Sequence, residues 1–205
     1  MIINADDWGL SPLFNKGIFE LAKRGVVTST TVMIRKKFIE SEKLLSLKNI
    51  SIGLHLDLSE KSSLKEVENQ LKLFEKKFKK TPSHLDGHRH CHLSKNNLLL
   101  VLKIAKKYNL PIRSRFLKDR KKIKKFCLKT PGSFISWHPD RLSILKERLA
   151  KIKTAAAELV CHPGYYDKKS TYPYNQKRKK ELNFLKSRQF NILLKKFKPI
   201  NYNEL

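Results

Sequence analysis

Short apolar runs alternate with amphipathic stretches along the whole chain. The runs are rich in Ile, Val and other residues that favour buried strands, and the stretches between them repeat apolar residues at helical spacing. Strands are predicted at Met1–Asn4, Val26–Ile34, Ile50–Leu58, Ser83–Asp86, Ile112–Phe116, Ser133–Trp137 and Ala157–Cys161, with Ile200–Tyr202 as a further strand that could close the sheet. This order predicts an α/β fold with a mainly parallel barrel or barrel-like sheet, in one domain over residues 1–205.

The predicted helices follow from start and stop signals as well as from periodicity. Ser11 and Pro12 form a helix start, and Ser94 and Asp140 are expected to cap two later helices. Helices are predicted over residues 12–25, 38–47, 64–80, 94–110, 118–129, 140–151 and, in part, 178–197, with an aromatic loop at Tyr172–Tyr174.

Several predicted strands end in residues that can bind a metal or transfer a proton. The segment Thr81–His92 holds four of the seven histidines, and Gly87 is expected to end its strand just before them. In a parallel α/β barrel the C-terminal ends of the strands meet at one rim, so residues far apart in sequence converge there. The residues at these ends are Asp6 and Asp7, His55, His88 with His90 and His92, and His162.

Each of these residues also has an ordinary structural interpretation. Asp6 and Asp7 are expected in a strand-to-helix loop, where aspartates often serve as surface or capping groups. A single histidine on an apolar strand, such as His55, is more often a core residue, and a histidine-rich loop can simply be solvated. Taken together, however, one carboxylate and two imidazoles can bind a divalent ion and leave positions open for water and substrate. A second carboxylate as base and another histidine as acid would complete a hydrolytic site.

Composition adds a large positive charge. The 205 residues include 35 Lys and 10 Arg against 18 acidic residues, for a formal net charge of +27. The densest basic block, Lys118–Lys129, keeps Ile123, Phe126 and Cys127 among its charges, as one face of a short helix would. Two interpretations stay open: a lysine-rich surface without a partner, or a surface that binds a polyanion or an anionic membrane.

Cysteines and hydropathy bear on the compartment. Cys91, Cys127 and Cys161 are an odd number without a CxxC pair, which favours reduced thiols. The sequence has no apolar run near eighteen residues and its start lacks the layout of a signal peptide, so a cytoplasmic protein without a transmembrane segment is expected.

Five blocks and a later one resemble, in the right order, the YdjC-like carbohydrate deacetylases, which include the chitooligosaccharide deacetylases. The resemblance implies a distorted TIM-type barrel related to the polysaccharide deacetylases, one divalent metal ion, either Mg²⁺ or Zn²⁺, and hydrolysis of the N-acetyl group of an amino sugar. The blocks are NADDWGLSPLFNKGI, VTSTTVMI, GLHLDL, HLDGHRHCHL and ELVCHPGY, followed by YNQKRKKEL.

Carried over by position, the resemblance also implies roles for single residues. Asp7, His55 and His88 would hold the metal, Asp6 would be the base and His162 the acid, and the roles of the two aspartates could be exchanged.

Further residues are expected around this centre. Asp86 is expected to orient a neighbouring imidazole, and Arg89, His90 and His92 would either line the sugar pocket or be loop residues.

The chain departs from the family pattern in three respects. Trp8 stands where the family usually has Phe, the segment between His55 and Thr81 is short, and the positive charge is high. Two other functions therefore stay open: a metal-dependent phosphoesterase acting on an anionic substrate, and a non-catalytic basic protein that binds RNA or an anionic membrane. The sequence also leaves open whether the chain forms a homo-oligomer.

Overall fold

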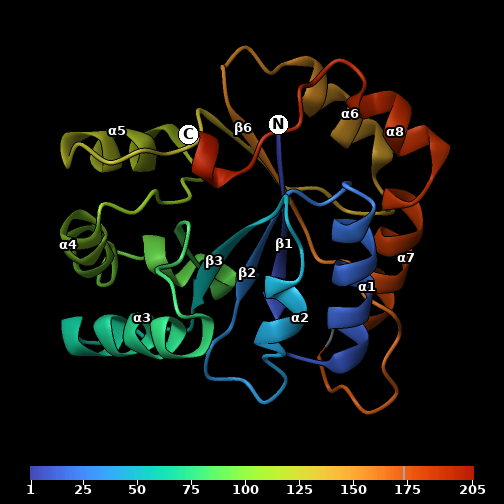
Figure 1. Cartoon of the computed structure of the whole chain (residues 1–205). Coiled ribbons are helices and arrows are strands. Elements are labelled where there is room, and N and C mark those ends of the chain that lie inside the picture. Colours follow the sequence, from blue (N-terminus) through green and yellow to red (C-terminus); the bar gives the residue numbers. More distant parts are fainter. Residues whose placement is uncertain (173) are drawn as a thin grey trace.

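A curled, six-stranded parallel sheet forms the centre of the molecule, seen in a computed structural model that describes residues 1–172 and 174–205 (Figure 1). Pro173, in the predicted aromatic loop, lies outside the described residues. The strand order is β4-β3-β2-β1-β6-β5, and all neighbouring strands are parallel. The strands are β1 (Ile2–Trp8), β2 (Ser29–Val32), β3 (Ser51–Leu56), β4 (Leu85–Gly87), β5 (Ser133–Ile135) and β6 (Ala157–Cys161).

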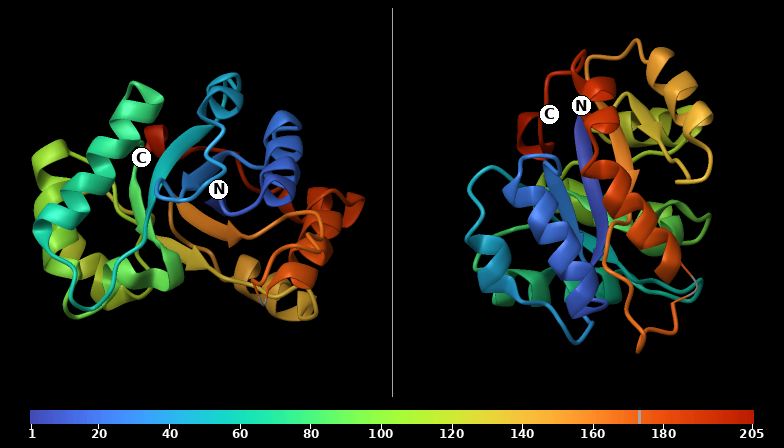
Figure 2. Two further views of the ribbon diagram at one scale, coloured as in Figure 1. Left: turned by 90° about the horizontal axis from the view of Figure 1, so that it is seen from below. Right: turned by 90° about the vertical axis from the view of Figure 1, so that its right-hand side faces the viewer.

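Helices surround the outside of the sheet, as the two views in Figure 2 show. None of the described helices is both long and apolar enough to cross a membrane. They are α1 (Pro12–Lys23), α2 (Ser41–Leu45), α3 (Leu64–Phe78), α4 (Leu98–Tyr108), α5 (Leu117–Lys125), α6 (Leu142–Ala150), α7 (Asn175–Leu185) and α8 (Arg188–Leu194), with two 3₁₀ helices, η1 (His88–Leu93) and η2 (Tyr202–Glu204).

The predicted helices are present, but several begin or end elsewhere. The cap of α1 is confirmed, because Ser11 Oγ accepts the N–H of Leu13 at 3.1 Å and Pro12 is the first helical residue. Ser94 Oγ accepts the Asn97 N–H at 3.3 Å and Ser94 O accepts the Leu98 N–H at 3.0 Å, so Ser94 caps the turn that leads into α4, which begins at Leu98. The cap predicted at Asp140 is wrong, since α6 follows Arg141.

The gap between the edge strands β4 and β5 is spanned by irregular chain. Ile112 forms an isolated parallel bridge to Leu85, and its N–H donates to Lys129 O at 3.0 Å. The strand predicted from Ile112 to Phe116 is therefore wrong beyond this bridge. Asp119 accepts the N–H groups of Arg115 and Phe116, at 3.3 and 2.8 Å, and this starts α5 instead of extending the sheet. The predicted distorted α/β barrel is confirmed.

One face of the sheet is apolar and the other is polar. On β1, for example, Ile3 and Ala5 belong to the hydrophobic core, whereas the alternate residues Asn4 and Asp6 are buried and hydrogen-bonded to each other at 2.7 Å. The same alternation on β2, β3 and β4 points polar side chains inside the curl, where Thr31 Oγ1 donates to Asp86 at 3.1 Å. The helices thus cover the apolar face of the sheet, and polar side chains line the inside of the curl.

The N-terminal ends of the strands are plugged by Tyr202, and the strand predicted at Ile200–Tyr202 is wrong. Tyr202 begins η2; its N–H donates to Ser51 Oγ at 3.2 Å and its hydroxyl to Glu158 at 2.7 Å. Its ring stacks on the buried His84, with centroids 3.4 Å apart. Gly53 makes room for this imidazole, because a Cβ at Gly53 would lie 2.3 Å from His84 Cε1. The segment therefore packs across the strand ends and does not join the sheet.

The buried His84 should make stability sensitive to acid. Burial is the main reason that the pKa of His84 lies well below 6.5, and Arg113 lowers it further. The unfolded chain then binds the proton more readily, so stability falls as the pH drops below about 6.5, by at most about 1.4 kcal/mol per pH unit. We expect His84→Phe to remove that part of the slope in urea unfolding between pH 6.5 and 5. Ser83→Ala, which deletes only the 2.9 Å contact of Ser83 Oγ with the ring, should keep it. Equal slopes for wild type and His84→Phe would contradict the assignment.

Candidate active site

A bulge at the end of β1 brings two adjacent carboxylates into one site. Ala5 pairs with Thr30 and Trp8 with Val32, so β1 carries one residue more than β2 in this interval. Asp7 has φ of 72°, in the left-handed region, and both Asp6 and Asp7 are buried. The prediction of a strand-to-helix loop here is wrong, because both residues belong to β1. The extra residue overrides the alternation that would otherwise send the two side chains to opposite faces.

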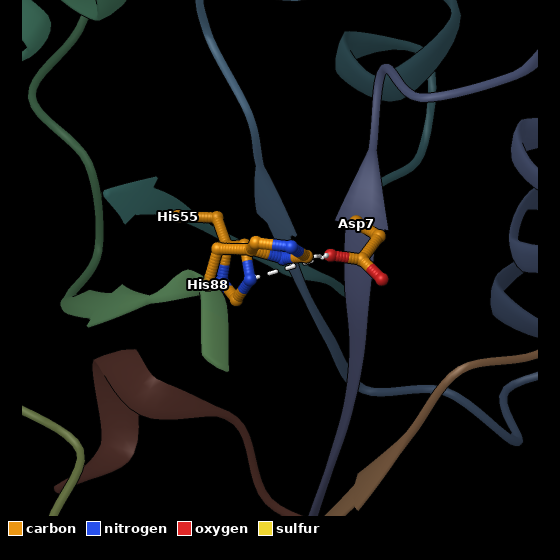
Figure 3. Close-up of side chains that lie close together, drawn as sticks. All are labelled: Asp7, His55 and His88. Carbon is orange, nitrogen blue, oxygen red and sulfur yellow. Dashed lines mark hydrogen bonds and ion pairs between the residues drawn. The ribbon is translucent and has the colours of Figure 1, made fainter. Parts of the chain in front are cut away.

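Asp7, His55 and His88 come together from three strand ends (Figure 3). Asp7 Oδ1 lies 3.3 Å from His55 Nε2 and 3.1 Å from His88 Nδ1, and the two rings meet edge to face at 5.7 Å. One oxygen and two imidazole nitrogens lie within 4.8 Å of one another, a donor set that could hold a metal ion. The three residues that the family resemblance names as ligands are thus brought together.

The orientation of His55 is set by Asp86. His55 Nδ1 lies 2.7 Å from Asp86 Oδ1, which directs Nε2 toward Asp7. Burial alone would lower the pKa of His55, but the nearby carboxylates, Asp86 first and then Asp6, outweigh it and raise the pKa well above its usual value. The surroundings of Nε2 therefore favour a positive charge there. The expected orienting role of Asp86 agrees with this contact.

Arg113 is the central cation of the site and was not predicted. Its guanidinium is fully buried and donates to Asp6 at 2.7 and 2.8 Å and to Glu158 at 2.7 and 2.9 Å. It also lies 2.8 Å from Asp86 Oδ2. Burial by itself would raise the pKa of Asp6, but Arg113 more than compensates and the pKa lies below its usual value. Asp6 is therefore held both ionised and in a fixed orientation.

His162 stands across the site from the metal-binding candidates. Its Nε2 lies 3.9 Å from Asp6 Oδ2, and about a third of its side chain is exposed. Its backbone N–H donates to the buried Glu181 at 2.6 Å, and Tyr174 donates to the other oxygen of Glu181, also at 2.6 Å. Burial, followed by the charge of Glu181, raises the pKa of Tyr174, which keeps its hydroxyl a donor. Glu181 thus joins the end of β6 to the ring that packs edge to face on His162.

Arg178, also not predicted, binds the side of Asp7 opposite the histidines. Its Nη2 donates to Asp7 Oδ2, and its guanidinium stacks on Phe14 with Cζ 4.3 Å from the ring centroid. Burial alone would raise the pKa of Asp7, but Arg178 first, and then contacts from His55 and His88, lower it well below its usual value. Because Oδ2 is engaged by Arg178, Asp7 presents mainly Oδ1 to the histidines.

The remaining histidines of the histidine-rich segment differ in position: His90 faces the cavity and His92 lies in the protein interior. The expected loop is the short helix η1, within which Arg89 and His90 have φ of 51° and 60°. His90 lines the cavity, and burial, followed by Arg113 and also Arg115, lowers its pKa to about 4. His92 lies behind the site and its Nε2 is 3.2 Å from Arg113 O.

These groups surround a cavity of about 310 Å³, near the lower end of the range for small-molecule sites. The lining combines charged, imidazole and phenol side chains with one aliphatic side chain, Val160. It comprises Asp6, Asp7, His55, Gly87, His88, Arg89, His90, Ser136, Val160, His162, Tyr172, Tyr174 and Arg178. Of the predicted residues, Asp86 and His92 do not line the cavity: Asp86 contacts the lining residue His55, and His92 contacts Arg113, which is itself outside the lining.

Comparison with known proteins gives relatives over nearly the full chain. A carbohydrate deacetylase from Clostridium beijerinckii is 31% identical, over 98% of this chain and 99% of that protein. A chitooligosaccharide deacetylase from Serratia marcescens is 27% identical, over 82% of each.

Solved structures agree on the fold. An Enterococcus faecalis protein named for cellobiose-phosphate cleavage superposes with a TM-score of 0.82 and 26% identity, covering 99% of this chain and 97% of that one. A Bacillus anthracis pseudoenzyme of the CE4 family superposes at 0.59 and 14% identity, covering 100% of this chain and 64% of that one, a likeness of fold alone.

The sequence pattern of the family described as YdjC-like protein matches residues 1–65 and 63–196. The two matches meet between His55 and Thr81, in the segment that is expected to be shorter here than in the family pattern. The resemblance seen in the sequence is confirmed, and the chain belongs to the YdjC-like protein family.

Proposed function

We propose that this protein is a carbohydrate deacetylase that removes the N-acetyl group of an amino sugar by metal-assisted hydrolysis. The observation that carries the proposal is the meeting of Asp7, His55 and His88 beside Asp6 and His162 in one cavity. The names of the relatives from Clostridium beijerinckii and Serratia marcescens support the reaction and the substrate class.

The residues present fit a divalent cation. Asp7, His55 and His88 would hold it through one oxygen and two nitrogens, with Asp86 fixing the tautomer of His55. When bound, the ion supplies Lewis-acid polarisation of the acetyl carbonyl and lowers the pKa of a water molecule. Buried negative charge supports the fit, because four carboxylates face only two guanidinium groups here: Asp6, Asp7, Asp86 and Glu158 against Arg113 and Arg178.

The same geometry favours Asp7 over Asp6 as the ligand. Asp7 Oδ1 is the oxygen within 3.3 Å of both imidazoles, whereas both oxygens of Asp6 are bonded to Arg113. Asp6 is then the proposed base. Its Oδ2 faces His162, and the bond to Arg113 keeps it ionised, which is the form that can accept a proton from the attacking water.

His162 is the proposed acid for the leaving amine. It lies on the far side of Asp6 from His55 and His88, with its side chain partly open to the cavity. Glu181 and Tyr174 hold the strand end that carries it. A proton delivered there would convert the poor amide leaving group into a neutral amine.

The division between ligands and catalytic groups predicts two kinds of variant. His55→Ala and His88→Ala should lose the metal and the activity together, because each removes a donor. Asp6→Asn and His162→Ala should keep the metal and lower turnover roughly 100- to 10,000-fold. Elemental mass spectrometry and acetate release from N-acetylated sugars measure the two properties, with His138→Ala, outside the cavity lining, as the matched control.

Two results would contradict this scheme. Full activity of Asp6→Asn would show that Asp6 is not the base. Phosphate is measured in the same assays with phosphorylated sugars, and metal-dependent release of phosphate without acetate would favour a phosphoesterase instead.

The contact of Arg178 with Asp7 leads to a separate prediction about the affinity of the site for a metal ion. Arg178→Met removes a positive charge beside Asp7 and frees Asp7 Oδ2. At an effective dielectric constant of about 20, two unit charges about 4 Å apart interact by about 4 kcal/mol, so a like charge beside a bound cation would weaken its binding. We therefore expect the dissociation constant of the ion, measured by titration calorimetry, to fall at least tenfold while turnover also falls.

Two controls separate charge from contact. Lys179→Met makes the same charge change on the exposed side of α7 and should leave metal affinity unchanged. Arg178→Lys keeps the charge and should bind the ion as the wild type does. Weaker metal binding by Arg178→Met would show instead that Arg178 acts by holding Asp7 in place.

A further inference from the structure

The start of α5 exposes two large apolar side chains to solvent. Phe116 is 52% exposed and Leu117 is 61% exposed, although they are neighbours in sequence. Their position is fixed, since the buried Asp119 accepts the Phe116 N–H at 2.8 Å and Ile123 anchors the helix to the core. The two exposed side chains are therefore held in place at the start of a helix.

The part of the chain that includes α5 carries a dense positive charge. Residues 87–139 contain fourteen Lys and Arg and one acidic residue, Asp119, which is buried. We define the α5 surface as residues 115–118 with Lys121, Lys122, Lys124 and Lys125, all exposed. Within the described part of the chain, none of its cations forms an ion pair. Its positive charge is therefore open to a partner.

Charges and apolar groups interleave on this surface. The Arg115 guanidinium lies 5.0 Å, and the Lys118 ammonium 5.8 Å, from the centre of the Phe116 ring. A helix with cations around a small apolar tip matches the boundary of an anionic bilayer, where headgroups bind the cations and the acyl region takes the tip. The attractions of the six cations to the anionic headgroups add together near such a surface.

We propose that the α5 surface docks the protein on an anionic lipid membrane, with Phe116 and Leu117 entering the interface. Lysine outnumbers arginine five to one on this surface, which suits diffuse attraction to headgroups better than bidentate binding of nucleic-acid phosphates. Leu117, the more exposed of the two, has no π-face on which a base could stack.

The chain that leads into α5 leaves the sheet beside β4, the strand that precedes His88. Ile112 bridges in parallel to Leu85, so the chain after Ile112 leaves the sheet on the same edge as the chain after β4, which carries His88. In Figure 1, α5 lies at the outer side of the molecule, next to α4. Docking here is independent of the proposed deacetylation and is tested without any activity assay.

The test is cosedimentation with vesicles of phosphatidylcholine containing 30% phosphatidylglycerol, and with pure phosphatidylcholine, in about 0.1 M NaCl. We expect the wild type to bind only the anionic vesicles. Phe116→Ser with Leu117→Ser should weaken binding about tenfold, and Lys121→Glu with Lys125→Glu should abolish it. Ile192→Ser, which alters a 54% exposed residue on α8, is the matched control and should bind as the wild type does. All altered side chains are exposed, and thermal unfolding checks that the variants fold.

A second measurement tests insertion itself. Phe116→Trp should gain fluorescence that brominated anionic lipids quench beyond any quenching of the native Trp8 and Trp137.

Three outcomes would overturn the proposal. The first is unchanged vesicle binding by the Phe116→Ser, Leu117→Ser variant. The second is binding to single-stranded RNA, lost with the lysines but not with the apolar pair, in the absence of vesicle binding. The third is self-association that the apolar pair alone controls, seen by light scattering without lipid.

Discussion

The site depends on one buried cation, Arg113. Its guanidinium contacts Asp6, Asp86 and Glu158, which come from three different strands. Three carboxylates could not share this interior without it, because each unpaired buried charge costs several kcal/mol. Asp6 is the proposed base, Asp86 orients His55, and Glu158 bonds to the Tyr202 plug. Arg113 therefore connects the proposed catalytic groups to the opposite end of the barrel.

The polar interior explains why the fold can hold such a network. Strand alternation sends the aliphatic side chains outward to the helices, so the hydrophobic core lies between sheet and helices. The inside of the curl is left to hydrogen-bonded groups such as Asn4 and Thr31. The residues of the hydrophobic core and those of the proposed site thus lie on opposite faces of the same strands. A substitution inside the curl therefore need not disturb the packing of the core.

The sequence predicted the residues whose position follows from strand order, and it missed those placed by tertiary contacts. His55, His88 and His162 directly end or follow apolar strands, so the rim could be predicted. Arg113 follows a segment with only one bridge to the sheet, and Arg178 stands in the basic run Lys177–Lys180. Nothing local separates either arginine from surface lysines, although arginine's rarity in this lysine-rich chain was a usable signal.

The bulge at Asp6 and Asp7 could not be predicted either. Two adjacent acids on a strand should face opposite sides, which made a loop the simpler expectation. The strain of the positive φ at Asp7 is offset by contacts of its side chain with distant residues, His55, His88 and Arg178. Similarly, Tyr202 ends a segment with strand-like composition, and only its bonds to Ser51 and Glu158 show that it plugs the barrel.

A net charge of +27 suggests repulsion of a divalent ion, but the distance of each charge from the site decides its effect. At physiological ionic strength, exposed charges are largely screened beyond about 8 Å. The carboxylates of Asp6, Asp7 and Asp86 are buried within the site, where screening is weak. Local carboxylates should therefore govern ion binding, together with the two arginines that oppose them. The cations of the α5 surface are exposed, so the docking proposed for them depends on other charges than those that would bind the ion, and the two proposed functions can change independently.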